Sequence, residues 1–233
     1  MTWSIVARDS GGALGIAVAS RFFAVGALCP YARSGVGAVC TQALVNPHYG
    51  PNGLDLLAKG TLPADAIESL IRGDEGREHR QLHMVDREGR IAAFTGRACI
   101  DWCGQRSGEG YSVAGNMLAG AAVLERTAAE YEMGKGLPFA ERLLAALAAG
   151  EAAGGDKRGK QAAALLVCTT EDYPFLDLRV DDHAAPIEEL RRLYRKSLER
   201  YQPFWRFLPS KARPAGTTDR AVIEDEIARS QRP

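Results

Sequence analysis

The segment TWSIVARDSGGALGIAVAS at residues 2–20 has the pattern of two β-strands joined by a tight turn. Residues 2–8 favour extended backbone, and the Asp-Ser-Gly-Gly sequence at 9–12 is a turn cluster. In residues 14–19 the large side chains of Leu, Ile and Val alternate with Gly and Ala. One face of the second strand is therefore almost bare, which suits a sheet packed closely against another layer. We expect a β-hairpin that begins at residue 2.

The remaining sequence predicts pairs of helices between groups of strands. Strand patterns occupy residues 35–41, 81–86, 90–95, the stretch before 116, 161–169 and 175–180. Helical patterns occupy residues 50–73 in two pieces, 119–133, 138–149, 186–201 and 221–228. Residues 104–110 are interpreted as a surface loop, with a loop over a pocket as the alternative. Paired helices differ from the strict alternation of a doubly wound sheet, so we expect two packed sheets covered outside by helix pairs.

The composition is that of an ordinary globular protein without net charge. Of 233 residues, 29 are Lys or Arg and 29 are Asp or Glu. This balance gives no electrostatic reason to expect nucleic acid or an anionic membrane as a partner, and it favours a small-molecule substrate. No stretch reaches the roughly 20 apolar residues of a membrane helix. The first residues lack the features of a secretory signal, so we expect a cytoplasmic protein.

The cysteines and histidines do not form the pattern of a metal site. Five cysteines are scattered along a chain without an export signal, which indicates reduced thiols and not a disulfide framework. Cys99 and Cys103 lack a second pair, and His48, His79 and His83 lack ligand spacing. We expect no metal and no cofactor.

Thr2 is the first residue that could carry chemistry. Methionine aminopeptidase removes Met1 when the next residue is small, and a new N-terminal threonine holds a hydroxyl and an α-amine on one residue. The usual pKa of an α-amine is about 7.7–8.0, so a fraction of it is free base near neutral pH. That amine can take the hydroxyl proton and create a nucleophile without a histidine. The alternative is an ordinary second residue, because many cytosolic proteins begin Met-Thr.

Several short segments of the sequence resemble, in the same order along the chain, segments of the bacterial family called domain of unknown function 1028. They are TWSIVARD at 2–9, LGIAVASRF at 14–22, GVGAVCTQA at 35–43, NPHYG at 46–50, GNMLAG at 115–120, GGDKRG at 154–159 and RVDDH at 179–183. The resemblance runs from residue 2 to about residue 190. That family is grouped with the N-terminal-nucleophile (Ntn) hydrolases, so the resemblance implies an α+β fold of four layers, αββα. It implies no particular substrate.

The start of the chain is also distantly similar to proteasome-type β subunits. Those subunits carry an Asp near the end of the second strand and a Lys soon after it. The comparable positions here hold Ala19 or Ser20, and Arg33. Arg33 and Arg21 could lower the pKa of the α-amine or bind a substrate carboxylate, or they could be solvated structural arginines. Asn116, next to Gly115, has the amide donor of an oxyanion hole, or it is a turn residue.

The glycine-rich motif at residues 154–161 does not match a phosphate-binding loop. It satisfies G-x-x-x-x-G-K, but Gln161 stands where a Ser or Thr must reach Mg²⁺. A helix is expected before it and a strand after it, the reverse of a P-loop. We interpret it as a helix-to-strand loop in which Asp156 or Arg158 could contact an anion or a substrate.

These observations define a main hypothesis and an alternative. The main hypothesis is hydrolysis of an amide-like C–N bond of a small molecule, with Thr2 as nucleophile, Asn116 and Arg33 assisting, and Ser20, Arg21, Asp156 and Arg158 binding substrate. It predicts Thr2 at an exposed strand start that faces a cleft between the sheets. The alternative is a non-catalytic small-molecule-binding or assembly protein on the same fold. We expect one domain at residues 1–205 and an extension at 206–233. The aromatic cluster at 204–207 suggests a homo-oligomer, with an intramolecular clamp as the alternative.

Overall fold

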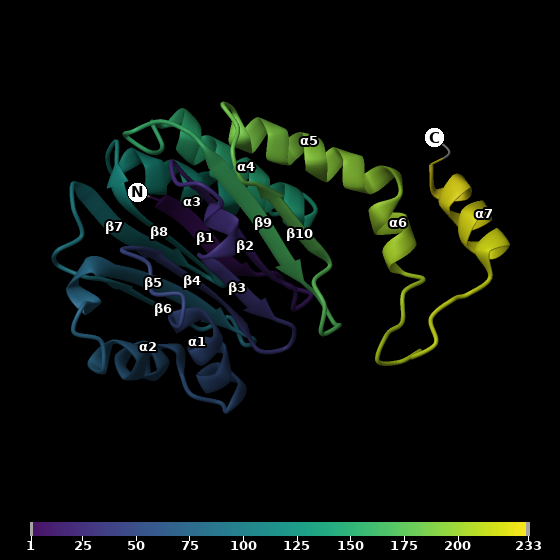
Figure 1. Cartoon of the computed structure of the whole chain (residues 1–233), viewed down its shortest axis with the longest axis horizontal. Coiled ribbons are helices and arrows are strands. Elements are labelled where there is room, and N and C mark those ends of the chain that lie inside the picture. The colour runs from purple at the N-terminus through teal and green to yellow at the C-terminus, as the bar shows by residue number, and fades with distance from the viewer. Residues whose placement is uncertain (1, 232–233) are drawn as a thin grey trace. The chain divides into compact units, whose positions relative to one another are not determined.

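Two antiparallel sheets form the centre of the computed structural model, which describes residues 2–231 (Figure 1). The six-stranded sheet has the order β10 (Leu176–Val180), β9 (Ala162–Cys168), β2 (Leu14–Ser20), β1 (Thr2–Arg8), β8 (Tyr111–Leu118) and β7 (Trp102–Gly108). The four-stranded sheet has the order β3 (Pro30–Arg33), β4 (Gly37–Ala43), β5 (Arg80–Asp86) and β6 (Ile91–Thr95). The predicted hairpin at the start of the chain is confirmed: β1 pairs with β2 from Thr2 opposite Ser20 to Arg8 opposite Leu14.

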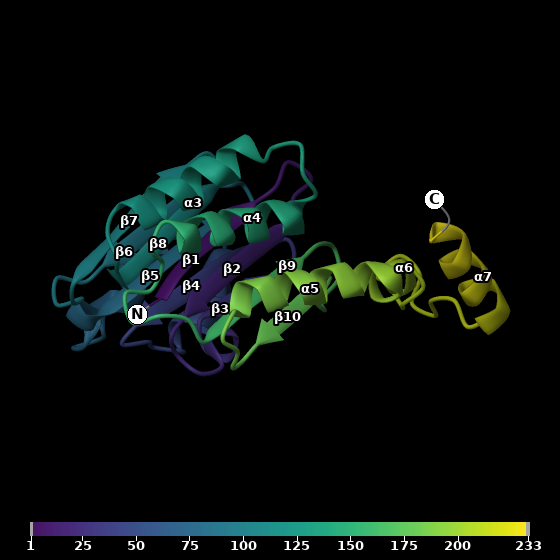
Figure 2. The same ribbon diagram turned by 90° about the horizontal axis from the view of Figure 1, so that it is seen from above.

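Helices cover the outer face of each sheet. Helices α1 (Tyr49–Ala58) and α2 (Pro63–Arg72) pack on the four-stranded sheet, and α3 (Ala122–Met133) and α4 (Phe139–Ala152) pack on the six-stranded sheet. Figure 2 shows α3 and α4 lying across that sheet. Strands β1 and β2 face strands β4 and β5 of the other sheet. The paired helices predicted from the sequence therefore occupy the outside of two packed sheets.

Strand β2 shows why the two layers approach so closely. All seven of its residues are buried. A Cβ atom added at Gly15 would lie 2.6 Å from Leu143 Cδ1 and 2.8 Å from Phe139 Cε1, so α4 packs directly on the bare face of the strand. On the opposite face, Ile16 and Val18 enter the hydrophobic core between the sheets. The alternation read from the sequence thus separates a helix-facing side from a sheet-facing side.

Two short strands were missed or misread from the sequence. Residues 104–110, expected to be a surface loop, belong mostly to β7, which pairs with β8 along the edge of the six-stranded sheet. The strand was hidden because its side chains are largely exposed and polar, as suits an edge. Strand β3 is only four residues long and begins with Pro30. Neither strand has the alternating apolar pattern that identifies a strand in sequence.

The chain divides into two compact units, residues 1–190 and 191–233. The division falls inside α5 (Pro186–Glu199), earlier than the boundary at residue 205 expected from the sequence. In the second unit, α6 (Tyr201–Trp205) packs on α7 (Arg220–Ser230). The Arg200 guanidinium donates to both carboxylate oxygens of Glu224, at 2.8 and 2.6 Å. None of the described helices is both long and apolar enough to cross a lipid bilayer.

Candidate active site

Thr2 lies at one end of the central strand β1, with its side chain between the two sheets. Successive side chains of a strand alternate in direction, and Ser4, two residues on, hydrogen bonds Gln42 and His83 of the other sheet. Thr2 therefore faces the same way. Its Oγ1 donates to Ser20 Oγ at 3.2 Å, and Asn116 lies opposite it on β8.

Thr2 is more enclosed than expected. The sequence predicted an exposed strand start, but Thr2 is only 6% exposed. The expectation was wrong because β1 is an inner strand of the sheet: β2 covers Thr2 on one side and β8 covers it on the other. Thr2 is nevertheless the first residue of the strand, and its neighbour on β8, Asn116, lines a cavity.

Polar side chains fill the space between the sheets near Thr2. Gln81 Nε2 donates to the carbonyls of Gly104 and Gly115, both at 3.0 Å, and to Thr95 Oγ1 at 2.9 Å. Gln81 Oε1 accepts from Gln42 Nε2 at 2.7 Å and from Asn116 Nδ2 at 3.1 Å. Buried polar groups cost free energy unless they are paired, and these are paired with one another. Gln81 therefore links the two sheets directly beneath Asn116.

A buried histidine continues this network along β1. Ser4 Oγ donates to Gln42 Oε1 at 2.7 Å, so it accepts from His83 Nε2 at 2.8 Å. His83 Nδ1 is then the acceptor for Ser112 Oγ, 3.2 Å away. Burial lowers the pKa of His83 to about 3, which keeps the imidazole neutral. We assign His83 to structural support, because no cavity that we describe is lined by it.

Three of the residues expected to bind substrate meet beside Thr2. The loop between α4 and β9 brings Asp156 to the end of β2, where its Oδ2 accepts from the Arg21 backbone N–H at 2.7 Å. Its Oδ1 accepts from the Arg158 N–H at 2.8 Å, and Arg158 Nη2 lies 3.2 Å from Oδ2. Arg21 also donates to the Arg158 carbonyl. The glycine-rich motif at residues 154–161 lies in this loop, so the expected order of helix, loop and strand is confirmed.

The glycines before Asp156 allow this close approach. Gly154 and Gly155 have φ values of 115° and 48°, a region that other residues rarely adopt. A Cβ atom at Gly155 would lie 3.1 Å from the Trp3 ring. These two glycines therefore allow the loop to pack against Trp3 of β1.

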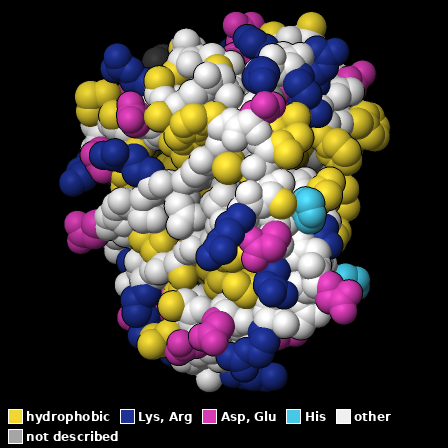
Figure 3. Space-filling model, turned by 90° about the vertical axis from the view of Figure 1, so that its left-hand side faces the viewer, with side chains coloured by type: hydrophobic (Ala, Val, Ile, Leu, Met, Phe, Trp, Pro, Cys, Tyr) yellow, Lys and Arg dark blue, Asp and Glu magenta, His cyan; other side chains and the backbone are white. Residues whose placement is uncertain are grey.

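A hydrophobic cavity of about 320 Å³ opens next to Asn116. Its walls come from the ends of several strands and loops, namely Phe22, Ala43, Leu44, His79, Ala98, Cys99, Ile100, Asn116, Met117 and Arg158. Phe22, Leu44 and Ile100 are exposed at its rim. Figure 3 looks onto this end of the molecule and shows hydrophobic side chains at the surface between charged ones. A small apolar ligand would fit such a site.

The backbone around this cavity is strained. Among the described residues other than glycine, four have positive φ, and two of them, Ala43 (70°) and Met117 (52°), line the cavity. Asp101 (56°) follows the lining residue Ile100. Each such conformation costs on the order of 1–3 kcal/mol and clusters at functional sites in known proteins. Ala43 and Met117 directly follow Gln42 and Asn116, so the strain lies where the polar network meets the cavity.

Arg33 is not brought to Thr2. It pairs with Gly37 at the far end of β4 from Gln42, about 17 Å away along the strand. Its Nη2 donates to Asp55 at 2.9 Å on the surface. The candidate site therefore contains Thr2, Ser20, Arg21, Asn116, Asp156 and Arg158, and it lacks Arg33. Sequence reasoning missed Gln42 and Gln81, whose signal is a polar residue on the sheet-facing side of an otherwise buried strand.

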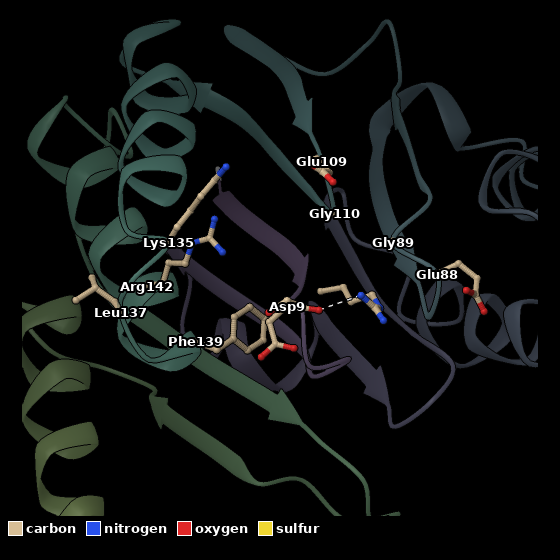
Figure 4. A pocket seen from close by; sticks show the side chains of 11 residues that line it. Asp9, Glu88, Gly89, Glu109, Gly110, Lys135, Leu137, Phe139 and Arg142 are labelled. Carbon is tan, nitrogen blue, oxygen red and sulfur yellow. Dashed lines mark hydrogen bonds between the residues drawn. The ribbon is translucent and has the colours of Figure 1, made fainter.

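A second cavity, of about 410 Å³, lies at the opposite end of β1. Thr2 and Arg8 are separated by about 20 Å of extended strand. Figure 4 shows Lys135 and Arg142 on one side of this cavity and Glu88 and Glu109 on the other. Its lining contains no residue of the cluster around Thr2. We therefore place the candidate active site at the Thr2 end, although the cavity there is smaller.

The thiols are poor candidates for an alternative nucleophile. Burial raises the pKa of Cys40 to about 12 and that of Cys99, which lines the hydrophobic cavity, to about 11. The reactive form of cysteine is the thiolate, so both are protonated near neutral pH. Within residues 2–231, no three His, Cys, Asp or Glu side chains group as a metal site.

Asp156→Asn tests how firmly this cluster is held. An amide NH₂ in place of one carboxylate oxygen would face an N–H donor, so at least one buried hydrogen bond is lost. We expect the free energy of unfolding to fall by about 1–3 kcal/mol in urea denaturation. Asp182→Asn is the control, because Asp182 is exposed and accepts only from Gln161 among the contacts that we describe. Equal midpoints for the two variants would contradict the assigned role of Asp156.

Comparison with known proteins agrees with the resemblance seen in the sequence. A model of the family of unknown function DUF1028 matches residues 2–190. The chain belongs to this family. Protein SPO2555 of Silicibacter pomeroyi, whose crystal structure is assigned to DUF1028, is 34% identical and has a TM-score of 0.87 over 94% of this chain and 96% of its own.

A more distant structure is Anbu, the ancestral β-subunit, from Yersinia bercovieri. It is 12% identical, with a TM-score of 0.39 over 84% of this chain and 94% of its own. No match was found among curated proteins. Membership of DUF1028 therefore establishes the family of the chain and leaves its activity to be argued from the site.

Proposed function

We propose that this DUF1028 protein is an Ntn-type amide hydrolase of small molecules that acts in the cytoplasm, with Thr2 as its nucleophile once Met1 has been removed. The observation that carries the proposal is the position of Thr2. Its hydroxyl lies between two packed sheets, at the end of a central strand and beside Ser20 and Asn116. The packing of two sheets between helix pairs supports the proposal, because the four-layer αββα order is what the resemblance to the Ntn class implies.

The reaction needs no group other than those of the chain and water. The free α-amine of Thr2 takes the proton of Oγ1, and Oγ1 forms a bond to the substrate carbonyl carbon. The C–N bond then breaks, and the ammonium returns its proton to the leaving nitrogen. Water hydrolyses the resulting ester on Thr2, releasing the acid and restoring the hydroxyl.

The neighbouring residues have distinct roles in this proposal. Ser20 Oγ accepts from the Thr2 hydroxyl and holds its rotamer. Arg21 and Arg158 carry two positive charges against the one negative charge of Asp156, and this net positive charge near the strand end favours the neutral amine, which is the base that the reaction needs. Asn116 Nδ2 donates to Gln81 Oε1 and, at 3.5 Å, to the Thr2 carbonyl. We therefore assign stabilisation of the oxyanion to backbone N–H groups and a positioning role to Asn116.

A panel of amides, lactams and ureido compounds tests the proposal. Protein whose N-terminus is Thr2 is expected to hydrolyse members of the panel, and protein that retains Met1 is expected to be inactive because its nitrogen is in a peptide bond. Equal activity of the two forms would overturn the role of the amine. The enclosure of Thr2 favours one alternative, a protein that binds such a compound without cleaving it. Binding without turnover by the processed protein would support that alternative.

We also propose that the protein is a homo-oligomer, with part of the region after Phe204 in its interface. Phe204, Trp205 and Phe207 are each only partly buried. Truncation after Gln202 is expected to give a smaller particle in light scattering that is still folded and unfolds cooperatively on heating. An unchanged particle mass, or unfolding of the truncated chain without a change in assembly, would favour an intramolecular clamp.

A further inference from the structure

The orientation of the Asn116 amide is set by the residues beneath it. Gly104 and Gly115 present carbonyl oxygens, which can only accept, so the Gln81 atom between them must be the NH₂ nitrogen. The other end of Gln81 is then an acceptor, and the Asn116 atom 3.1 Å from it must be a donor. Asn116 is thus held with Nδ2 toward Gln81 and Oδ1 turned away.

The Asn116 Oδ1 atom has no hydrogen-bond partner among the described residues. The hydrogen bonds that we find for this side chain are both made by Nδ2. The side chain belongs to a residue that is only 2% exposed. Yet Oδ1 is not one of the unpartnered polar atoms that are sealed completely from solvent. The one cavity we describe that Asn116 lines is the hydrophobic cavity of about 320 Å³, and we take it to be the space that this acceptor faces.

The rest of that cavity offers little to a charged ligand. Phe22, Leu44, Ile100 and Met117 are among its apolar walls. Among Lys, Arg, Asp and Glu the lining contains Arg158 alone, and Asp156 already pairs with its guanidinium; the lining also contains one imidazole, that of His79. Burying an unpaired charge against apolar walls costs far more than burying an amide that makes its hydrogen bond. The site therefore favours a neutral ligand with one N–H donor.

We propose that this cavity binds secondary amides that carry an apolar chain, with the amide N–H donated to Asn116 Oδ1 and the chain against Phe22, Leu44 and Ile100. This assignment rests on the proposed function, because it supplies the substrate class for the same site. Asn116 then selects for an N–H on the substrate. A tertiary amide has no such proton and leaves Oδ1 without a partner inside the site.

Binding of simple amides to Thr2→Ala protein tests the proposal without turnover. The probes are hexanamide, N-methylhexanamide, N,N-dimethylhexanamide and N-methylacetamide, with dissociation constants from ligand-observed NMR titration. N,N-dimethylhexanamide is expected to bind about 10-fold more weakly than N-methylhexanamide, because the unpaired acceptor is penalised. Each methylene removed from the chain is expected to weaken binding up to about fourfold. Equal affinity of secondary and tertiary amides, or no dependence on chain length, would overturn the assignment.

Two matched variants locate the binding. Leu44→Ser, at the rim of the cavity, is expected to weaken N-methylhexanamide binding several-fold, whereas Leu137→Ser, which lines the cavity at the Arg8 end, is expected to leave it unchanged. Both leucines are exposed, at 63% and 43%, so neither change should impair folding. The opposite order of effects would place the ligand elsewhere. Since these are binding measurements, they can fail while hydrolysis by Thr2 holds, and they can succeed if the protein proves not to be a hydrolase.

Gln81→Met tests the role of the residue that orients Asn116. Without Gln81 Oε1 the Asn116 amide is free to rotate, so the preference for secondary over tertiary amides should shrink while the dependence on chain length remains. A preference that stays intact in folded Gln81→Met protein would show that Gln81 does not set the selectivity. If this variant does not fold, the amide series and the leucine pair still decide the proposal.

Discussion

Thr2→Ala is expected to lower turnover by about 10³-fold or more while leaving the protein folded. The variant keeps the α-amine, since alanine is also small enough for removal of Met1, but it lacks the oxygen that attacks the substrate. Losses of this size are typical when the nucleophile of a hydrolase is removed. The measurement is kcat/KM on the best substrate of the amide panel, made on protein whose N-terminal processing has been verified.

The effect of Thr2→Ala on stability is expected to be small. Thr2 Oγ1 makes one hydrogen bond, to Ser20 Oγ at 3.2 Å, so its loss costs about 1 kcal/mol. In a chain of this length that corresponds to a fall in Tm of about 2–4 °C. Thr2→Ser is the control and should retain turnover. Loss of activity accompanied by a large fall in Tm would identify Thr2 as a structural residue.

Acidification is expected to destabilise the protein through His83. Burial lowers the pKa of His83 to about 3 in the folded protein, whereas its usual value in an unfolded chain is about 6.5. Between these values the unfolded chain binds one proton more than the folded protein, so stability falls as pH falls from 6.5 toward 3. From pH 7 to pH 4.5 the loss from this group is roughly 2–3 kcal/mol. Urea denaturation at the two pH values measures it.

His83→Gln separates this contribution from the rest. A glutamine amide is neutral at every pH, and it can replace the hydrogen bonds to Ser4 and Ser112. The variant should therefore lose stability less steeply than the wild type as pH falls. The pKa of Asp74 is held low, chiefly by the Tyr49 hydroxyl, and its contribution is common to both proteins and cancels. Parallel pH profiles would show that His83 is not buried in its neutral form.

The strands and helices with a strong apolar period were predictable from the sequence. In β2, Ile16 and Val18 alternate with Gly15 and Ala17. Because successive side chains of a strand point to opposite faces, this alternation identifies both the strand and the face with small side chains. The helix pairs follow from the same kind of periodicity. Edge strand β7 could not be found in this way, because the consecutive residues Gln105, Arg106 and Ser107 are all exposed, so neither face of the strand carries an apolar pattern.

The candidate site was predictable only in part. Ser20 lies next to Thr2 because the hairpin register requires it, and that register follows from the turn at residues 9–12. The proximity of Asn116 and Asp156 to Thr2 depends on the order of the strands in the sheet, which the local sequence does not encode. Arg33 was misplaced for the same reason: it is near Ser20 in sequence, but the intervening turn carries it to the far end of the other sheet.

The network through Gln81 was also beyond sequence reasoning. A lone glutamine on a buried strand has no ligand spacing or motif, and its partners come from β4, β6, β7 and β8. Its importance lies in the geometry of those four strands around it. Met1 lies outside the described residues, so its removal remains a prediction.

The intact mass of the protein purified from its native host tests the central claim most directly. If Thr2 is the nucleophile, the measured mass is that of the 233-residue chain less one methionine residue, without N-terminal acetylation. Brief incubation with a slowly hydrolysed amide should then add the mass of its acyl group to the peptide that begins at Thr2. Quantitative retention of Met1 would contradict the account, since an α-amine in a peptide bond cannot act as the base.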